Sequence, residues 1–482
     1  MPPSTERSTI KVQTERAVLA AVRLPTSVYD QANPFGELRA LAEQAGAVVV
    51  GEIEQRASKG TAATYMGSGK VKELKALCDA LGAQVVIFDH DLSPRQIANI
   101  EEVLAAGTKP GEGCKVIDRS ELILDIFAAR ATTHEAKLQV ELAQLEYTLP
   151  RLRAMWSHLE RITGSGAAGG IGTRGPGEQQ LEIDRRLAQR KKLDLQHELA
   201  GIYARKRRMV QDRRRDHFTV GIVGYTNAGK STLFNTLTQG GAYADNRLFA
   251  TLVTRTRDWN LEGGFKVMLS DTVGFVRELP HHLIASFRAT LEEATHADVL
   301  LIMLDISDPA AELEYRTVIE TLDELEEEVR DAEKRDGNLP EQNLDGEGWT
   351  PPKRILLLNK ADRLKDNRAV LVWKQKVPDA IVISAIQPPP GGLGQEDLRQ
   401  RILATARQGL IEADITVPIS DGKALQRLEN RAEVLDRSYD DSGTMVTMRV
   451  RIGRRQLDML RSGSRNLRIH ELNGKAPAPG KG

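Results

Sequence analysis

The sequence predicts an α/β protein of several domains, and three observations support this. Strand-like and helix-like segments alternate from about residue 15 to 118 and again from about 217 to 409, which predicts parallel sheets with flanking helices. A basic region with helical apolar spacing separates the two stretches. The 482 residues are also too many for one hydrophobic core.

The first α/β domain is predicted over residues 15–118. Strands are expected at 17–22, 47–53, 85–88 and 115–117, and helices at 34–45, 71–81 and 94–104. The stretch Gly67-Ser68-Gly69-Lys70 resembles a shortened phosphate loop, but no strong apolar strand precedes it. We expect a helix start there, with Ser68 as the capping residue. A second nucleotide site is the alternative, and loss of all nucleotide binding in Lys230→Ala would exclude it.

A two-helix antiparallel hairpin is predicted over residues 119–216. Apolar residues alternate by four and three along the first helix and recur every seven along the second, which is typical of packed helices. These residues are Leu138, Leu142, Leu145, Leu149, Leu152, Trp156 and Leu159, then Leu181, Ala188, Leu195, Ile202 and Met209, with Leu199 in addition. Pro150 predicts a kink in the first helix.

The hairpin tip, residues 164–177, is rich in glycine and has one arginine, Arg174. A flexible linker is one interpretation. The other is a probe whose backbone approaches RNA closely, with Gly170, Gly172, Arg174 and Gly175 as contact candidates. The second helix favours a polyanion partner, because residues 185–215 hold twelve Lys or Arg against three Asp or Glu.

The segment Gly224 to Ser231 matches G-x-x-x-x-G-K-S, the phosphate-binding loop of nucleoside triphosphatases. An apolar strand precedes it and a helical pattern follows it, as phosphate binding at a helix start requires. Lys230 supplies a cation for the phosphates, and Ser231 supplies a hydroxyl for Mg²⁺. The loop residues expected to contact nucleotide are Gly224, Tyr225, Thr226, Asn227, Ala228, Gly229, Lys230, Ser231 and Thr232.

Three further motifs follow at strand ends and predict a GTP site. Asp271 can support Mg²⁺ and the Gly274 amide can sense the γ-phosphate. The Asp362 carboxylate accepts two hydrogen bonds that guanine offers and adenine lacks. The residues expected around the base are Asn359, Lys360, Asp362, Ser384 and Ala385. Together with the phosphate loop, these motifs predict a GTPase domain over residues 217–409.

Hydrolysis needs groups around the γ-phosphate, for which Lys230, Thr251 and Gly274 are the candidates. Thr251 is also expected to complete the Mg²⁺ site from a switch segment, with Thr254 and Thr256 as competitors. Phe275 stands where many GTPases have a water-orienting glutamine, so slow intrinsic hydrolysis that a partner accelerates is expected. Asn227 is a candidate potassium ligand; its alternative role is a hydrogen bond within the loop.

The remaining segments flank this domain. An acidic insertion is expected at residues 331–352. A small β-α-β domain is predicted at 410–472, with a helix capped at Ser420-Asp421 that reaches Leu435. Residues 473–482 are expected to be a disordered tail.

Composition indicates a cytoplasmic protein. Only two cysteines are present, no run approaches the ~20 apolar residues of a membrane helix, and the N-terminus lacks the apolar core of a signal peptide. Basic and acidic residues balance at 67 each, yet the basic stretch is local, so a nucleic-acid partner is not excluded. We expect a monomer without a membrane anchor.

The layout over residues 15 to 452 resembles the HflX family of ribosome-associated GTPases. The motifs that carry the resemblance are Gly67–Lys70, Asp118-Arg119 with Leu122–Phe127, Gly169–Glu178, Gly224–Ser231, Leu248–Thr251 and Asp271–Phe275. The acidic insertion and the polar tails depart from the family pattern. The resemblance implies binding of the large ribosomal subunit, with the hairpin tip near the peptidyl-transferase centre.

The same resemblance implies GTP-dependent splitting of stalled ribosomes, linked to stress and to resistance against antibiotics bound at that centre. Two alternatives belong to other function classes. An assembly GTPase would act as a chaperone on large-subunit precursors without splitting mature ribosomes. A membrane or protein signalling switch would need a lipid anchor or an apolar interaction stripe, and the sequence has neither.

Overall fold

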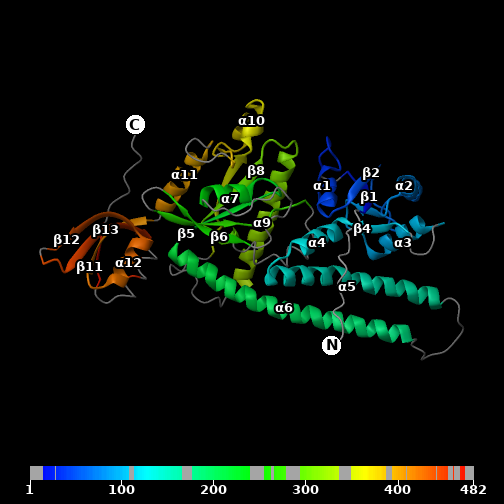
Figure 1. Ribbon diagram of the computed structural model, residues 1–482, viewed down its shortest axis with the longest axis horizontal. Helices are drawn as coiled ribbons and strands as arrows, with labels where there is room; N and C mark the ends of the chain where they lie inside the picture. Colours follow the sequence, from blue (N-terminus) through cyan, green and yellow to red (C-terminus); the bar gives the residue numbers. More distant parts are fainter. Residues whose placement is uncertain are drawn as a thin grey trace, which may run out of the picture. The chain divides into compact units, whose positions relative to one another are not determined.

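The computed structural model describes residues 15–25, 27, 29–107, 113–164, 176–238, 254–261, 265–277, 294–335, 349–386, 393–408, 410–440, 442–453, 457, 460 and 467–472. The chain divides into two compact units, and the division falls within α6 (Pro176–Asp216), after Gly201. Among the described residues, the first unit contains one sheet and the second contains two (Figure 1).

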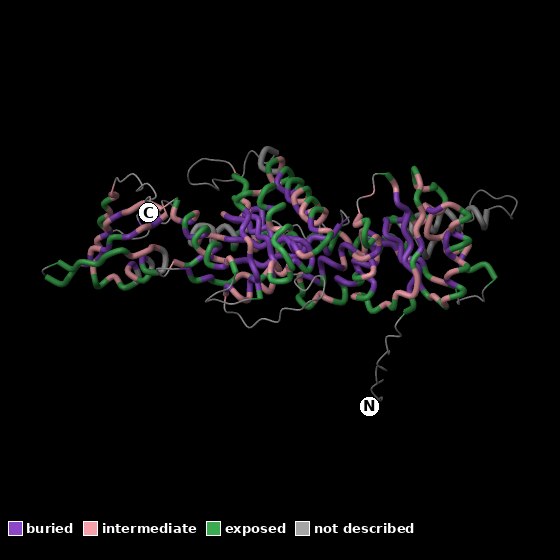
Figure 2. The backbone as a smooth tube through the Cα atoms, turned by 90° about the horizontal axis from the view of Figure 1, so that it is seen from above, coloured by how far each residue is buried: buried purple, intermediate pink, exposed green. Residues whose placement is uncertain are grey.

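The first unit is built on a parallel sheet in the order β2-β1-β3-β4. Its strands are β1 (Arg16–Arg23), β2 (Val48–Arg56), β3 (Val85–Phe88) and β4 (Lys115–Asp118). The helices α1 (Gly36–Gln44), α2 (Ser68–Leu81) and α3 (Pro94–Ala105) alternate with these strands. Strand β1 is buried from Ala17 to Arg23, as its apolar run predicts (Figure 2). The predicted alternation in this region is therefore confirmed.

The helix start at residue 68 is confirmed, but Ser68 is not its cap. Gly67 occupies the N-cap position and α2 makes no side-chain cap hydrogen bond. Ser68 is the first residue inside the helix. A capping side chain belongs to the residue before it, where it can accept hydrogen bonds from the first free amides of the helix. The Gly67 amide instead donates to Gln55 Oε1 at 2.7 Å, and Lys70 pairs with Glu73 at 2.8 Å within the helix.

A separate helix, α4 (Arg119–Arg130), precedes the hairpin, and the sequence pattern did not separate it. Asp118 caps it by accepting from the Glu121 amide at 2.9 Å. Helix α4 packs against α1, β3 and β4 as well as against α5 (His134–Gly164). Its many buried residues on more than one face explain why helical periodicity is weak there.

Helices α5 and α6 are antiparallel where the first unit contains both, as predicted. Lys192 Nζ lies 3.0 Å from Glu146 Oε1, and His134 Nε2 lies 2.8 Å from Glu198 Oε1, so sequence position rises on one helix as it falls on the other. On α6, Leu195 and Leu199 are buried, but Met209 of the predicted seam is 53% exposed. Helix α5 continues through Pro150. The tip candidates Gly170, Gly172, Arg174 and Gly175 lie outside the described residues.

The first sheet of the second unit has the order β10-β9-β8-β5-β7-β6 and is parallel except for β6, which runs antiparallel to β7. Its strands are β5 (Phe218–Gly224), β6 (Arg255–Asn260), β7 (Lys266–Asp271), β8 (Val299–Asp305), β9 (Lys353–Asn359) and β10 (Ile381–Val382). The helices are α7 (Lys230–Thr238), α9 (Ala311–Arg335), α10 (Arg368–Lys376) and α11 (Gln395–Arg407), with the short 3-10 helix η2 (Ala361–Arg363). Strand β6 and helix α10 were not predicted.

The C-terminal sheet keeps the predicted order of strand, helix and strand but adds two strands that were not predicted. It is antiparallel in the order β12-β13-β11-β14, with β11 (Leu410–Pro418), β12 (Glu433–Tyr439), β13 (Met445–Gly453) and β14 (Arg468–Glu471). Helix α12 (Gly422–Arg431) is capped by Asp421, as predicted, but ends before Leu435. Leu435 lies in β12, which pairs with β13 along the sheet edge, so strand pairing overrides the helical pattern there.

Two predicted segments fall wholly or partly outside the described residues. The tail 473–482 and the insertion residues 336–348 are among them. Just after the insertion, Trp349 Nε1 donates to the Thr295 carbonyl at 3.1 Å. In the described part of the chain, no helix is long and apolar enough to cross a membrane.

Candidate nucleotide site

The phosphate loop joins β5 to α7, and its two glycines are required by close contacts. Gly224 has φ +152°, and a Cβ there would meet the Met303 carbonyl oxygen at 2.3 Å. Gly229 has φ +98°, and a Cβ there would meet Asn359 Nδ2 at 2.4 Å. Both positions therefore exclude a side chain, and the loop curls so that its amides and the start of α7 converge.

Lys230 is the buried cation of the loop. Its Nζ donates to the Gly224 carbonyl at 3.1 Å and to the Tyr225 carbonyl at 2.6 Å. Burial lowers the pKa of Lys230 to about 8, while the Asp271 carboxylate acts in the opposite direction. A bound phosphate would favour the charged form, so the site is arranged for an anion beside this ammonium group.

Ser231 and Asp271 bring two oxygen ligands together. Ser231 Oγ donates to Asp271 Oδ2 at 2.8 Å, and Asp271 is fully buried at the end of β7. Strand β7 pairs with β5 in a register that places Asp271 beside Ile222. No group of three or more His, Cys, Asp or Glu with metal-binding geometry occurs among the described residues. A hydroxyl and one carboxylate fit Mg²⁺, which takes few protein ligands and completes its shell with phosphates and water.

The segment after Asp271 is bonded directly to the phosphate loop. Phe275 N donates to the Gly224 carbonyl at 3.0 Å, and Thr226 N donates to the Phe275 carbonyl at 2.8 Å. A Cβ on Gly274 would lie 2.9 Å from Lys230 Nζ, so the Gly274 backbone closes on the cation. The Phe275 side chain is buried and offers no polar atom for a water molecule.

Asn359 ties the segments at residues 359–362 and 384–385 to the phosphate loop. Its Nδ2 donates to the Ala228 carbonyl at 2.7 Å, and its Oδ1 accepts from Ala385 N at 3.0 Å. Asp362 is exposed, and its Oδ1 accepts from Ser384 Oγ at 2.6 Å. Asn359 therefore links its own strand end to the segments that contain Ala228 and Ala385. The Asp362 carboxylate is exposed, as contact with a base would require.

Family models match most of the chain in three consecutive segments. A GTP-binding GTPase N-terminal model matches residues 33–128, a GTP-binding GTPase middle-region model matches 130–215, and a 50S ribosome-binding GTPase model matches 219–339. GTPase HflX of Magnetococcus marinus is 38% identical over 437 residues, which are 90% of this chain and 92% of the relative. The chain belongs to the HflX GTPase family.

Other relatives agree with this assignment. GTPase HflX of Escherichia coli K12 is 37% identical over 390 residues, covering 80% of this chain and 82% of the relative. A solved structure, SsGBP in complex with GDP, is 25% identical, with a TM-score of 0.41, and covers 82% of this chain and 99% of that one. The family models and the HflX relatives confirm the resemblance to the HflX family, and the chain is a GTPase with a phosphate-loop domain.

The structure adds site residues of this HflX-family chain that the sequence did not indicate. Lys360 has φ +60° and its Nζ pairs with Asp305 Oδ2 at 2.6 Å, so the end of β8 fixes the base loop. Buried Gln395 donates to the Ser384 carbonyl at 3.0 Å. Gln395 lies on α11, far along the chain from Asn359, and no motif spacing marks it.

The switch and potassium candidates have different outcomes. Thr251 lies outside the described residues. Its competitor Thr256 lies in β6, 3.1 Å from Ser270 Oγ, in a strand paired along its length with β7. A paired strand does not suit a switch ligand that must move. Asn227 is exposed with φ +62°, and the potassium hypothesis stays a prediction.

Proposed function

We propose that this chain binds the large ribosomal subunit and uses GTP to split or rescue stalled ribosomes in the cytoplasm during stress. Resistance to antibiotics bound near the peptidyl-transferase centre is part of the same proposal. The observation that carries it is the combination of a guanine-nucleotide site with a basic helix. Arg185, Arg190, Arg205 and Arg208 of α6 are exposed, as binding to an RNA backbone requires.

In this proposal the loop Gly224–Thr232 holds the phosphates, and Asn359, Lys360, Asp362, Ser384 and Ala385 hold the base. Ser231, Asp271 and Thr251 would hold Mg²⁺, which neutralises charge on the phosphates when bound. Lys230 and the Gly274 amide would stabilise charge on the γ-phosphate during hydrolysis. Phe275 supplies no hydrogen bond to the attacking water, so we propose slow hydrolysis until the ribosome contributes a group.

Sedimentation of intact ribosomes tests the function directly. Full-length protein with a non-hydrolysable GTP analogue is expected to convert the intact peak into separate subunits. An intact peak that persists with protein bound to the large subunit would instead favour an assembly role. Lys230→Ala is the matched control, because it removes the buried cation of the nucleotide site.

The tip is tested in the same assay with residues 165–175 replaced by a short Gly-Ser linker. This variant is expected to bind GTP normally and to lose splitting. Full splitting by the shortened variant would show that the tip has no part in the function.

A further inference from the structure

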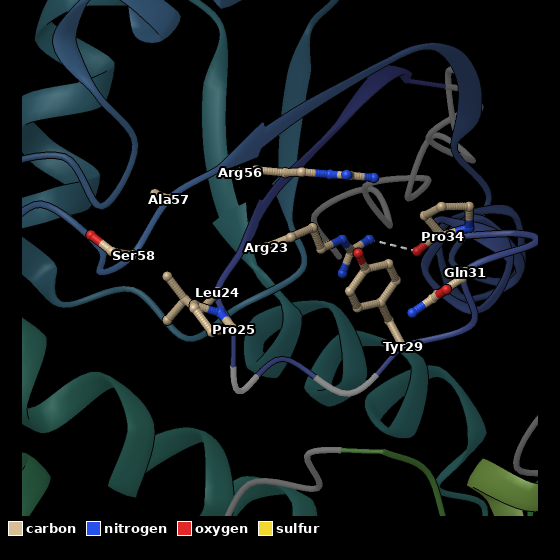
Figure 3. Close-up of a pocket in the computed structure, with 9 residues that line it drawn as sticks. All are labelled: Arg23, Leu24, Pro25, Tyr29, Gln31, Pro34, Arg56, Ala57 and Ser58. Carbon is tan, nitrogen blue, oxygen red and sulfur yellow. Dashed lines mark hydrogen bonds between the residues drawn. The ribbon is translucent and has the colours of Figure 1, made fainter.

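A cavity lies within the first unit. Its volume is about 660 Å³, within the range of small-ligand sites. It lies at the carboxyl ends of β1 and β2 and under the loop from β1 to α1 (Figure 3). The charged, aromatic and polar side chains that line it include Arg23, Tyr29, Gln31, Arg56 and Ser58.

The order of the sheet places this cavity next to a reversal of winding. Strand β2 lies next to β1 on one edge of β1, and β3 lies next to β1 on its other edge. The chain therefore passes β1 on its way from β2 to β3. The direction of winding therefore reverses between β1 and β3, and the cavity lies next to this point, at the ends of β1 and β2. In parallel sheets, ligands bind beyond the carboxyl ends of strands at such a reversal. Arg23 is the last residue of β1, and Arg56 is the last residue of β2.

The charges that line the cavity indicate an anionic ligand. Arg23 is only 4% exposed, its Nη1 donates to Asp89 at 2.7 Å and its Nη2 donates to the Pro34 carbonyl at 2.6 Å. Within the described part of the chain, its Nε has no hydrogen-bond partner. The nearest acid to this Nε is Glu54, at 3.9 Å.

Arg56 adds a second guanidinium group with an 83% exposed side chain, held to Glu54 only by a 3.4 Å contact. No Asp or Glu is among the described residues that line the cavity. The exposed Arg56 group thus borders the space, and the buried Arg23 Nε lies in its wall with Glu54 near both groups. A phosphate is an anion that guanidinium groups bind well.

The cavity also offers a stacking surface. The Arg23 guanidinium carbon lies 4.3 Å from the centroid of the Tyr29 ring. In the view of Figure 3, the Arg23 side chain extends between those of Arg56 and Tyr29. Aromatic rings and guanidinium planes are the surfaces on which unpaired bases stack. Gln31 and Ser58 supply polar groups for base edges.

The cavity does not suit a nucleoside triphosphate. The segment 24–35 between β1 and α1 contains no glycine and no lysine, so it cannot cradle several phosphates as residues 224–231 do. The Gly67–Lys70 stretch is a helix start, and Lys70 is paired with Glu73. A lining carboxylate that could support Mg²⁺ is absent from the described lining residues. One phosphate with one base fits better.

We infer that this cavity holds a single unpaired nucleotide of RNA, with its base beside Tyr29 and its phosphate on Arg23 Nε and Arg56. The inference rests on the proposed function, which supplies RNA as the partner. It adds to that function a base-capturing site in the N-terminal domain, separate from the basic helix and the hairpin tip.

The test uses the full chain and a single-stranded hexaribonucleotide that carries one 4-thiouridine. After irradiation and trypsin digestion, the cross-link is expected in peptide 24–39, which contains Tyr29. Arg56→Ala is expected to lower the yield at this peptide at least fivefold, as is Tyr29→Leu. Arg95→Ala removes an exposed arginine of α3 and is the matched control, with an unchanged yield expected.

Competition separates the ligand classes. An abasic hexamer should compete poorly, and free nucleoside monophosphates or inorganic phosphate should compete only at far higher concentration. Cross-links confined to α6, equal yields in Arg56→Ala and Arg95→Ala, or full competition by free nucleotide or phosphate would each overturn the inference. Ribosome splitting is scored separately, so a protein that splits ribosomes but shows no such cross-link refutes this site alone.

Discussion

At the scale of single residues, the buried ammonium group of Lys230 favours the binding of an anion. The ammonium group is buried against two loop carbonyls, and burial lowers its pKa from 10.5 to about 8. The loop therefore holds a desolvated charge that a phosphate would stabilise. Asn359 acts differently, because its amide is engaged within the protein on both sides and positions three loops at once.

Lys230 leads to a prediction about pH and stability without nucleotide. A lysine with a lower pKa in the folded state binds fewer protons when folded, so its contribution to stability rises with pH between about 8 and 10.5. From pH 7 to 9.5, wild type should gain up to about 2 kcal/mol relative to Lys230→Met. Urea unfolding of both proteins at the two pH values measures this. Parallel changes in the two proteins would contradict the burial of a charged Lys230.

At the scale of elements, one buried carboxylate fastens the carboxyl end of the first sheet. Asp89 follows β3 and accepts from Arg23 of β1 and from Arg119 of α4, each at 2.7 Å. Arg119 also pairs with Glu37 of α1 at 2.8 Å. The network is almost fully buried, and it joins two strands and two helices that apolar packing alone would leave free to slide.

Removing Asp89 should therefore be costly. Asp89→Ala leaves two buried guanidinium groups without their shared partner, and the free energy of unfolding should fall by about 3–5 kcal/mol. Urea unfolding followed by circular dichroism measures the loss. Arg39→Ala is the control, because Arg39 pairs with Glu52 on the surface, and such a pair contributes at most about 1 kcal/mol. Similar losses of unfolding free energy in both variants would mean that the buried network contributes no more stability than a surface ion pair.

At the scale of the whole molecule, the chain behaves as two units that share the long helix α6. The GTP site lies entirely in the second unit, on loops that follow β5, β7, β9 and β10. The cavity at Arg23 lies entirely in the first. Ligands of the two sites should therefore stabilise different parts of the protein.

Differential scanning calorimetry with and without GDP and Mg²⁺ tests this division. Two transitions are expected, and ligand at about 100 times its Kd should stabilise one unit by about 2.7 kcal/mol. That transition should move upward by roughly 5 °C or more, while the other stays in place. Lys230→Ala should abolish the shift. Equal shifts of both transitions would show that the two units unfold as one.

The sequence alone determined the elements whose local chemistry is strong. The β5 apolar run, the glycine spacing of the phosphate loop and the motifs at Asp271 and Asp362 predicted a GTP site in a parallel sheet. Each of these features depends on a few neighbouring residues at the end of a strand, so the local sequence pattern is enough to predict it. The same holds for the alternation in the first domain and for the Asp421 cap.

Only the tertiary structure decided the rest, because those features depend on partners far along the chain. The Lys360–Asp305 pair, the Asn359 hydrogen bonds and the Asp89 network join segments that no spacing rule links. Leu435 has a helical neighbourhood but lies in β12 because its neighbours Val434 and Asp436 pair with β13. Strand pairing and buried charge are satisfied by the fold as a whole, and a linear pattern does not record where those partners will be.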